Sequence, residues 1–600
     1  MGLGGHFQVV LLAIALQVQG AQPVSHGGLV VGQVIDAVSK RPVAGVVVAL
    51  VGPPGRNGQP RLPVLTGTDG RFVFRDMPRG NYNLNAIKPG YVDGAHGRTR
   101  PGGPSAPLAI NEGERRGDIV LRLWRHAAIS GTVTDESGER QVGIQVRAYR
   151  RTAAAGKRRY AAAGVASTDD RGIYRIGTLT PGDYIVGTAP RHLSVPLSLM
   201  RDGGLESQQM AAELTGRGGA LVLRDAGYVL GPGSPTPPPP AGGRLVVYPP
   251  IYHPSAPAGE AASVIPLLPG QDHDGADIQI APVSSVSVAG FIMGPDGPVT
   301  ATPVRLVPAG ATEVPAAADG LSTITDRQGG GFIFPAVPSG YYTLKLNRGL
   351  SSGFPGRGGI EPAVIWVDLP LTVGTEDIEN LGVTANAGIR ISGRFEFEGD
   401  PSRPRGSLQN VQITIVPADL VAGTLERPVV ARPNGFGEFT SPPLPGGRYY
   451  VRIADSPAGW MFKAATVEGR DVADTPLTLS SDTTNVTLQF TDRWSGLGGR
   501  VQVDRGPATD AAVVVFPTDL DAWGSSGQFS RRLRMTRVAA GGEYSFNLPA
   551  GDYYVIAIPD EQAADWQDPD FLAEASREAI RVRIGDGERT LQDVRLRVTR

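Results

Sequence analysis

The chain has 600 residues, with 81 Gly and 52 Pro, and only 6% of its residues are aromatic. Its net charge of −1 offers no positive field for nucleic acid or for an anionic membrane surface. The absence of Cys excludes disulfides, thiolate metal sites and a cysteine nucleophile. At roughly 150 residues per domain, a chain of this length is expected to divide into several domains.

The beginning of the chain has the pattern of an export signal. Residues 7–18 (FQVVLLAIALQV) are apolar except for two Gln, and they are too few to span a bilayer, which needs about 20 apolar residues. Val18 and Gly20 are the small residues of a cleavage site, so we expect residues 1–21 to be a signal peptide. The alternative is a first buried strand, because residues 1–6 carry no Lys or Arg.

Export would place the mature chain in the periplasm, the outer envelope or the extracellular space. No later segment approaches 18 uninterrupted apolar residues, so we expect no transmembrane segment in the mature chain.

One pattern recurs five times along the chain, and two glycines mark each copy. The first glycine opens an apolar strand, and the second comes just before a Tyr in a Pro/Gly turn. Both keep a spacing of about 105 residues, except that the second interval is about 50 residues longer. The opening glycines are Gly32, Gly131, Gly290, Gly393 and Gly499, and the later ones are Gly80, Gly182, Gly340, Gly447 and Gly551.

These repeats predict five tandem domains of similar fold. The expected domains are residues 22–124, 125–283, 284–386, 387–492 and 493–600. The second domain would contain the extra residues as an insert, 192–243, which includes a Pro run at 235–240. We expect this insert to be polar, partly disordered and of polyproline II character, and to be the first segment that a protease cuts.

Within each copy the local signals are those of β-strands. Short β-branched runs are bounded by Pro, Gly or Asp, and Asp69-Gly70 is a hairpin turn that places Phe72 and Phe74 on one face of the next strand. Short strands, tight turns and a period near 100 residues predict an all-β tandem array of about five antiparallel β-sandwiches. One short C-terminal helix is expected within 562–580, with Pro569 in its first turn.

The first copy resembles a known family. PVAGVVVAL (42–50), TDGRFVF (68–74) and PRGNYNLNAIKPGY (78–91) are similar to the carboxypeptidase regulatory-like domain. This transthyretin-like (prealbumin-like) β-sandwich is an accessory module of metallocarboxypeptidases and of many exported bacterial proteins. The second and fifth copies share the resemblance, whereas the third and fourth lack the Asp-Gly turn. The resemblance implies a fold and a multi-copy exported protein, and it implies little about activity.

The residues for a hydrolytic site are not found in the sequence. None of the seven His is followed by Glu three residues later, so the metal-binding pair of a zinc carboxypeptidase is missing. Ser351 lies in a G-x-S-x-G pattern, but a Gly- and Pro-rich stretch follows it where a nucleophile elbow needs a helix. We therefore expect no enzyme activity and no cofactor. The basic run 157–159 is predicted to be a solvated hairpin loop, not a nucleic-acid site.

Three carboxylates lie close together before the closing strand of the second copy. Asp272, Asp274 and Asp277 could supply oxygen ligands to Ca²⁺, but no Glu follows at the far end of the loop. The preferred interpretation is a polar turn without metal.

Tryptophans in loops are the remaining candidates for a ligand site. Trp523, with Asp519 and Asp521 nearby, could stack a sugar ring and accept hydrogen bonds from its hydroxyls. Its Gly- and Ser-rich surroundings predict a partly exposed indole. Trp460 and Trp566 are further candidates, and the preferred interpretation for all three is that they cap the end of a sandwich core.

These patterns lead to two hypotheses of function. The first is a non-catalytic exported protein that serves as an envelope or extracellular scaffold or binding protein. The alternative is a carbohydrate-binding protein that uses the loop tryptophans. A polysaccharide or an envelope protein would be the partner.

Overall fold

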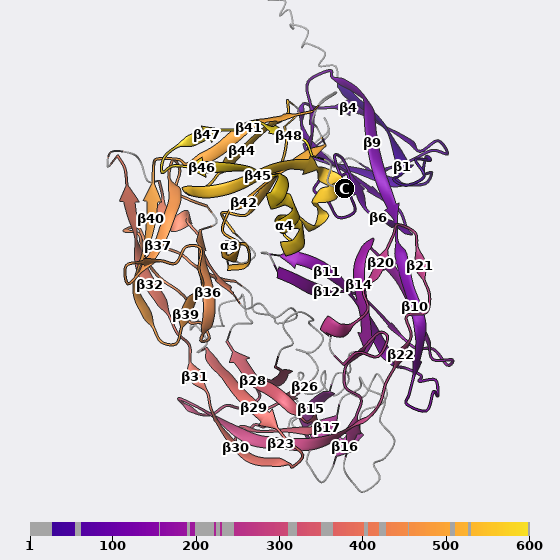
Figure 1. The fold of residues 1–600 in the computed structure, drawn as a ribbon, viewed down its shortest axis with the longest axis vertical. Helices are drawn as coiled ribbons and strands as arrows, with labels where there is room; N and C mark the ends of the chain where they lie inside the picture. The colour runs from indigo at the N-terminus through magenta and orange to yellow at the C-terminus, as the bar shows by residue number, and fades with distance from the viewer. Residues whose placement is uncertain are drawn as a thin grey trace, which may run out of the picture. The chain divides into compact units, whose positions relative to one another are not determined.

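The computed structural model describes residues 27–54, 62–154, 157–188, 192–197, 221–223, 228–230, 245–257, 259–309, 321–349, 364–400, 402, 406–418, 428–453, 455–503, 510–525, 530–539 and 541–597. The expected signal peptide, Ser351 and the Pro run 235–240 lie outside them. The chain divides into two compact units, Met1–Trp124 and Arg125–Arg600. Over the described residues the strands form ten sheets, which enclose five cores as tandem β-sandwiches (Figure 1).

The first sandwich shows the plan that the others repeat. Its first strand lies between a hairpin strand and the closing strand in one sheet, and the Tyr-containing strand is central in the other. The first sheet has the order β4-β1-β9-β6, with β1 (Gly28–Asp36), β4 (Arg71–Met77), β6 (Tyr91–Val92) and β9 (Arg115–Arg125). The second has β3 (Val64–Leu65), β2 (Val47–Val51), β5 (Gly80–Ile87) and β7 (Gly94–Ala95), and β8 (Leu108–Ile110) also pairs with β5.

The second sandwich has a long hairpin at one edge. One sheet contains β13 (Ile173–Leu179), β10 (Ala127–Thr134), β21 (Asp272–His273) and β22 (Ile278–Gln279). The other contains β12 (Lys157–Ser167), β11 (Gln145–Ala154), β14 (Gly182–Thr188), β19 (Ile251–Tyr252) and β20 (Ile265–Leu267), with the short 3-10 helix η1 (Gly259–Ala261) after β19.

The third sandwich takes strands from the insert of the second copy. One sheet contains β18 (Val246–Val247), β23 (Val283–Gly294), β24 (Gly297–Pro298), β27 (Gly331–Pro338) and β30 (Ile378–Thr384). The other runs β16 (Leu221–Leu223), β17 (Tyr228–Leu230), β15 (His192–Pro196), β26 (Leu321–Ile324), β25 (Pro303–Pro308), β28 (Gly340–Arg348), β29 (Ile365–Val373) and β31 (Asn386–Ala387).

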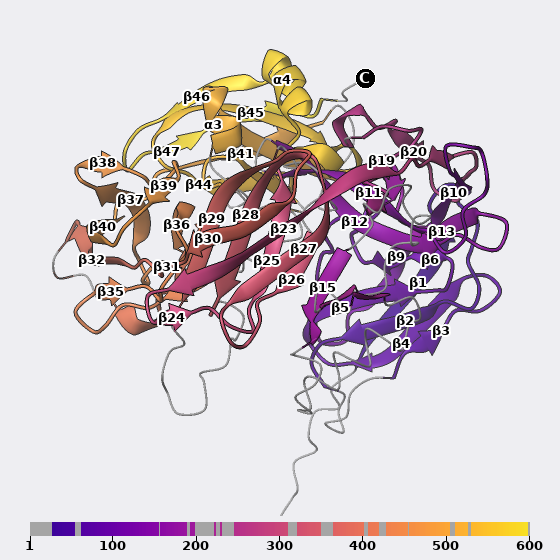
Figure 2. The same cartoon turned by 90° about the horizontal axis from the view of Figure 1, so that it is seen from below.

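The beginning of the insert is therefore not the polar excursion that the sequence analysis expected. β15 pairs in parallel with β26, where Leu193 lies opposite Ser322 (Figure 2). Val195 is fully buried, and the hydroxyl of Ser194 donates a 2.7 Å hydrogen bond to the carbonyl of Ile333. The expectation is wrong for residues 192–196 because their apolar residues extend an existing sheet edge.

The fourth sandwich follows the common plan. One sheet contains β35 (Glu438–Thr440), β32 (Ile391–Glu398), β40 (Thr483–Thr491), β37 (Met461–Val467) and β38 (Arg470–Asp471). The other contains β34 (Val429–Ala431), β33 (Ile413–Pro417), β36 (Gly447–Ile453) and β39 (Leu477–Leu479), and the 3-10 helix η3 (Leu408–Asn410) precedes β33.

The fifth sandwich adds helices to the plan. One sheet contains β44 (Glu543–Asn547), β41 (Gly496–Gln502), β47 (Arg589–Leu591) and β48 (Val594–Arg595), and the other contains β43 (Arg534–Arg537), β42 (Ala511–Pro517), β45 (Gly551–Pro559) and β46 (Ile580–Ile584). Its helices are α3 (Asp521–Ser525), the 3-10 helix η4 (Asp560–Asp565) and α4 (Pro569–Glu578).

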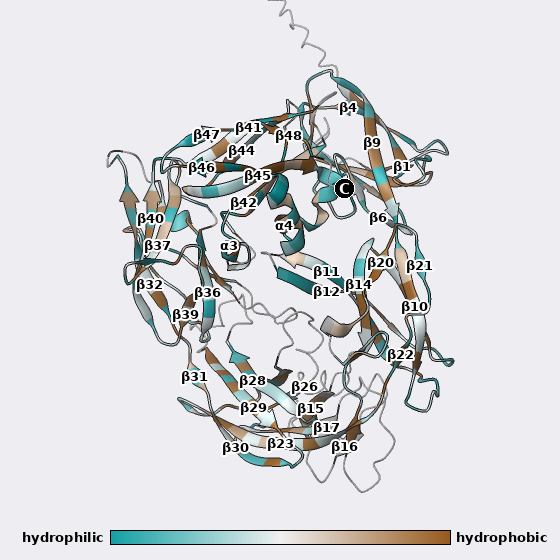
Figure 3. Cartoon of the chain, viewed as in Figure 1, coloured by the Kyte–Doolittle hydropathy of each residue, from teal (hydrophilic) through white to brown (hydrophobic). Residues whose placement is uncertain are grey.

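The C-terminal helix is shorter than the expected range 562–580, because α4 begins only at Pro569 and η4 is separate from it, whereas the first-turn position of Pro569 is confirmed. Pro569 occupies the first turn of α4, and the carboxylate of Asp568 caps the helix by accepting the N–H of Asp570. The outer face of β42 and β45 is buried under α3, η4 and α4, which form a second core with this sheet. β42 is consequently buried along its whole length and coloured hydrophobic, whereas α4 is mostly hydrophilic (Figure 3).

The opening glycine of each copy lies where the first strand meets the closing strand. The closing strand pairs with the first in parallel, so this sheet is mixed, not purely antiparallel. A Cβ on any of these glycines would overlap a backbone carbonyl oxygen on that side. For Gly32, Gly290 and Gly393 the oxygen belongs to the closing strand and would lie 2.6, 2.2 and 1.8 Å away. For Gly131 and Gly499 it belongs to Ala276 and Gln592, just before that strand, at 2.4 and 2.0 Å. On the antiparallel side, these glycines face Phe72, Tyr174, Phe332, Phe439 and Tyr544, respectively.

The tyrosine two residues after the second glycine makes the same hydrogen bond in every copy. Its hydroxyl donates to the carbonyl four residues upstream, across the Pro/Gly turn, at 2.5–3.0 Å. This contact fixes the chain where it enters the central strand of the second sheet. The pairs are Tyr82–Pro78, Tyr184–Thr180, Tyr342–Pro338, Tyr449–Pro445 and Tyr553–Pro549.

Alanine substitutions in the third sandwich test the opening glycine. We expect Gly290→Ala to lower the free energy of unfolding by about 3 kcal/mol, because the new methyl would overlap the carbonyl of Leu381. Gly374→Ala is the matched control, since a Cβ there meets nothing within 4 Å, and it should change stability by less than about 0.5 kcal/mol. Urea unfolding measures both, and equal effects would contradict the role of the glycine.

Candidate functional site

The indole of Trp523 is a core side chain. It is 5% exposed, lies edge-on to Phe516 with ring centroids 5.6 Å apart, and donates a 2.8 Å hydrogen bond to the carbonyl of Pro517. The expectation of a partly exposed ring is wrong, because α3 turns the indole onto the outer face of β42. Asp519 and Asp521 are exposed nearby, where Asp519 accepts the N–H of Asp521.

The other two candidate tryptophans lie in different surroundings. Trp460 is 1% exposed in the core of the fourth sandwich, with Phe397 edge-on at 4.9 Å. Trp566 is half-buried, packs against the core beneath the helices and lines a cleft. Of the three, only Trp566 borders a space that a ligand could enter.

The carboxylates of the candidate calcium loop bind different protein groups. Asp272 pairs with Arg175 at 2.8 Å, and Asp274 accepts the hydroxyl of Ser130. Asp277 accepts both the N–H and the hydroxyl of Thr132, each at 2.8 Å. These contacts favour the polar turn, and no group of three or more acidic or His side chains within the described residues could hold a metal ion.

The basic run of the second copy does not lie in solvent as a free loop. Arg158 donates to both carboxylate oxygens of Asp568 at 2.7 and 2.9 Å, and it also pairs with Asp570. The hairpin β11–β12 therefore contacts the first turn of α4. Burial acts to raise the pKa of Asp568, but hydrogen bonds from Arg158 and from backbone N–H groups outweigh it and lower the pKa.

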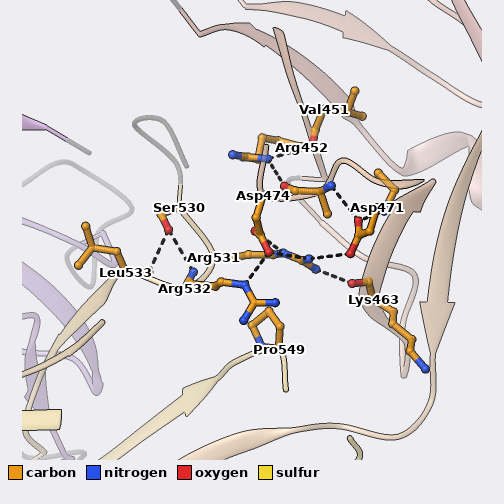
Figure 4. Close-up of polar contacts among 12 residues, drawn as sticks. Val451, Arg452, Lys463, Asp471, Asp474, Ser530, Arg531, Arg532, Leu533 and Pro549 are labelled. Atoms are coloured by element: carbon orange, nitrogen blue, oxygen red, sulfur yellow. Dashed lines mark hydrogen bonds and ion pairs between the residues drawn. The ribbon is translucent and has the colours of Figure 1, made fainter. Parts of the chain in front are cut away.

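A half-buried ion cluster joins the fourth and fifth sandwiches (Figure 4). Asp474, between β38 and β39, accepts Nε and Nη2 of Arg531 at 2.8 and 3.0 Å and Nε of Arg532 at 2.6 Å. Arg531 also donates to the carbonyl of Lys463 at 2.6 Å, and Arg532 donates to the hydroxyl of Tyr553 at 3.0 Å. We call Asp474, Arg531 and Arg532 the Asp474 clamp.

The clamp holds Asp474 as an anion. Burial acts to raise the pKa of its carboxyl, but the hydrogen bonds and charges of the two arginines dominate and lower the pKa to about 2. The Asp474 side chain is 20% exposed and that of Arg531 is 15% exposed, so this pair is shielded from water far better than a surface ion pair.

A cleft of about 600 Å³ opens beside the clamp. Arg452, Arg531 and Arg534 contribute to its wall, together with apolar atoms of Phe462 and Trp566. Arg452 donates to the carbonyl of Ala473 at 2.5 Å. Burial lowers the pKa of Arg452 to about 10, with Asp474 opposing the shift and Arg531 adding to it, so this guanidinium remains charged at neutral pH.

The sequence carries no local signal for this cleft. The segment around Trp566 does not show what the indole faces, and nothing in the residues around Asp474 marks it as the partner of two arginines more than 50 positions later. For the clamp, the adjacent pair Arg531-Arg532 was the available signal, because two neighbouring arginines in a buried segment need an anion.

The comparisons with known proteins identify the first sandwich. Residues 30–110 match the model of the carboxypeptidase regulatory-like domain, so this sandwich is such a domain. A search of the curated proteins finds no match.

Several solved structures resemble the chain weakly. The TIE protein of Bacillus anthracis is 12% identical over 74% of this chain and 67% of its own, with a TM-score of 0.14. A streptococcal ancillary pilin is 11% identical over 60% of this chain and 98% of its own (TM-score 0.18). Two B repeat units of the collagen-binding protein of Staphylococcus aureus are 12% identical over 77% of this chain and 99% of their own (TM-score 0.13). Likenesses at this level carry no argument about function.

Replacing Trp523 tests its assignment to the core. We expect Trp523→Ala to destabilise the fifth sandwich by about 3–5 kcal/mol, because a large buried side chain is removed. The control is Leu520→Ala in the same segment, whose side chain is 66% exposed and should contribute little. Thermal unfolding measures both, and an unchanged melting temperature for Trp523→Ala would contradict burial of the indole.

The lowered pKa of Asp474 predicts how acid acts on this junction. A carboxyl whose pKa falls from 3.8 unfolded to about 2 folded stabilises the folded state above the higher value. The difference corresponds to roughly 2 kcal/mol, which should be lost as the pH falls through the folded value. Urea unfolding at a series of pH values should show this loss for the native chain and not for Asp474→Asn. Asp519→Asn, which changes an exposed carboxylate of the fifth sandwich, is the control, and a native-like acid dependence in Asp474→Asn would refute the assignment.

Proposed function

We propose that this chain is an exported, non-catalytic scaffold or binding protein of the cell envelope or the extracellular space, in which the third, fourth and fifth β-sandwiches are held in a fixed arrangement. A scaffold must keep the parts that it carries at defined distances from one another, and domains joined by loose linkers would not do so. The observation that carries the proposal is the Asp474 clamp, a half-buried contact between consecutive sandwiches.

A second junction supports the same interpretation. Trp366 on β29 of the third sandwich packs against the core of the fourth and donates a 3.0 Å hydrogen bond to the carbonyl of Ala387. Its indole lies against Gly446, where a Cβ would come within 2.5 Å of the ring. A glycine at that position lets the ring lie directly on the backbone of the next sandwich.

The proposal of export has its own support. Residues 7–18 have the apolar pattern of a signal peptide, and the first sandwich is a carboxypeptidase regulatory-like domain, a family that the sequence analysis associates with exported bacterial proteins. No helix within the described residues is long and apolar enough to cross a membrane.

The carbohydrate-binding alternative receives less support from the geometry. Stacking a sugar ring requires an exposed aromatic face, and both Trp460 and Trp523 are buried. Only Trp566 remains, in a wall that also carries three arginines.

Calorimetry of the full chain tests the fixed junction. We expect several transitions in the native chain, with the fourth and fifth sandwiches unfolding together because the clamp couples them. Arg531→Ala should separate that shared transition into two, whereas Arg500→Ala, which removes an exposed ion pair with Glu543, should not.

Separate melting of the fourth and fifth sandwiches in the native chain would contradict the scaffold. Hydrolysis of peptides, esters or glycosides by the purified chain above a buffer control would contradict the absence of catalysis.

A further inference from the structure

The wall of the cleft beside the clamp is positively charged, unlike the chain as a whole. It contains Arg452, Arg531 and Arg534 and no carboxylate, although the chain as a whole has a net charge of −1. Asp474 and Asp471 pair with Arg531 at 2.8 and 3.9 Å, and neither of these carboxylates lines the cleft. The cleft therefore presents a net positive wall.

Two other clefts in the described part of the chain show that this charge is not general. One of about 440 Å³, on the outer face of the fifth sandwich, balances two arginines with Glu543 and Asp593. The other, about 620 Å³ and beside Trp366, contains Asp368 and Asp482 and no basic side chain. Of these three clefts, the one beside the clamp offers a free anion the most favourable field.

The three arginines are positioned differently. Arg531 is held rigid by Asp474 and lies over the ring of Phe462, 5.3 Å from its centroid. Arg452 is 9% exposed, donates to the carbonyl of Ala473 and lies over the ring of Tyr450, 4.5 Å from its centroid. Arg534 begins the edge strand β43 with an exposed side chain, so its guanidinium can turn toward a ligand.

The rest of the wall is largely apolar and partly aromatic. Phe462 and Trp566 contribute ring atoms, and Met535 contributes a flexible thioether, the side chain that adapts best to an irregular apolar body. A cleft of this size holds a molecule of one or two rings. A small inorganic anion would leave these apolar surfaces uncovered.

We propose that this cleft binds a small aromatic carboxylate, with the carboxylate directed at the arginines and the ring between the side chains of Phe462, Met535 and Trp566. The planar guanidinium fork matches a carboxylate in a way that a neutral hydroxyl cannot. This inference stands apart from the scaffold proposal, since a rigid junction would exist without any ligand.

The test compares three probes on the full-length protein. 2-Naphthoate has both the ring and the charge, 2-naphthylmethanol has the ring alone, and acetate has the charge alone. Calorimetric titration should show binding of 2-naphthoate at least about tenfold tighter than of either other probe, and weakening as NaCl is raised. Equal affinity for 2-naphthoate and 2-naphthylmethanol, or no binding of 2-naphthoate, would overturn the proposal.

Variants then locate the binding. Arg534→Gln should weaken 2-naphthoate binding by about tenfold without changing the melting temperature, because the side chain is exposed. Arg500→Gln removes the same charge from the other sheet of this sandwich and should leave binding unchanged. Met535→Glu, which adds a negative charge to the wall, should abolish binding. Equal loss in both arginine variants, or full binding by a folded Met535→Glu protein, would place the ligand elsewhere.

Discussion

In each sandwich, a glycine of the first strand lies with its α-carbon against a carbonyl of the closing strand or of the residues just before it. In the fourth sandwich a Cβ on Gly393 would lie 1.8 Å from the carbonyl oxygen of Val486, so any other residue would push the two strands apart. The parallel pairing of these strands brings the end of each repeat back beside its beginning. Within Arg125–Arg600 the closing strand leads directly into the next repeat, so this contact also determines where the following sandwich starts.

The tyrosine hydrogen bond connects this plan to the junction of the last two sandwiches. Tyr553 fixes the entry into β45 by donating to Pro549, and its oxygen also accepts a hydrogen bond from Arg532 of the clamp. Burial raises the pKa of Tyr553 to about 12, so the hydroxyl stays protonated and can make both bonds. A residue that every copy uses for its own fold thus gains a second role in the fifth copy.

Much of the fold could be predicted from the sequence, because the informative residues act locally and recur. The glycines, the Pro/Gly turns and the apolar alternation each constrain the backbone within a few positions, and five copies make the pattern visible. The strand HLSVP at 192–196 was missed because its partner, β26, lies more than 100 residues later. The sequence analysis also did not predict that α3, η4 and α4 cover the outer face of β42. The unbroken apolar run of β42 is typical of a strand that is buried on both faces.

The site was far less accessible to sequence reasoning. Whether Trp523 is exposed depends on the direction in which α3 turns its side chain, and composition does not determine that direction. The clamp and its cleft arise from residues of different repeats, at positions that the other copies do not share. A repeated residue pattern is visible in a single sequence, whereas this site is formed by residues of the fourth and fifth copies that do not belong to the repeated pattern.

The most direct test of the central claim is native-state hydrogen exchange along the fourth sandwich. If contact between the first and closing strands holds the sandwich together, the amides of β40, paired with β32 on one side and β37 on the other, should exchange only on global unfolding. Amides of the turn at Glu468 and Gly469 should exchange many orders of magnitude faster. Exchange of β40 at the rate of that turn would contradict the account.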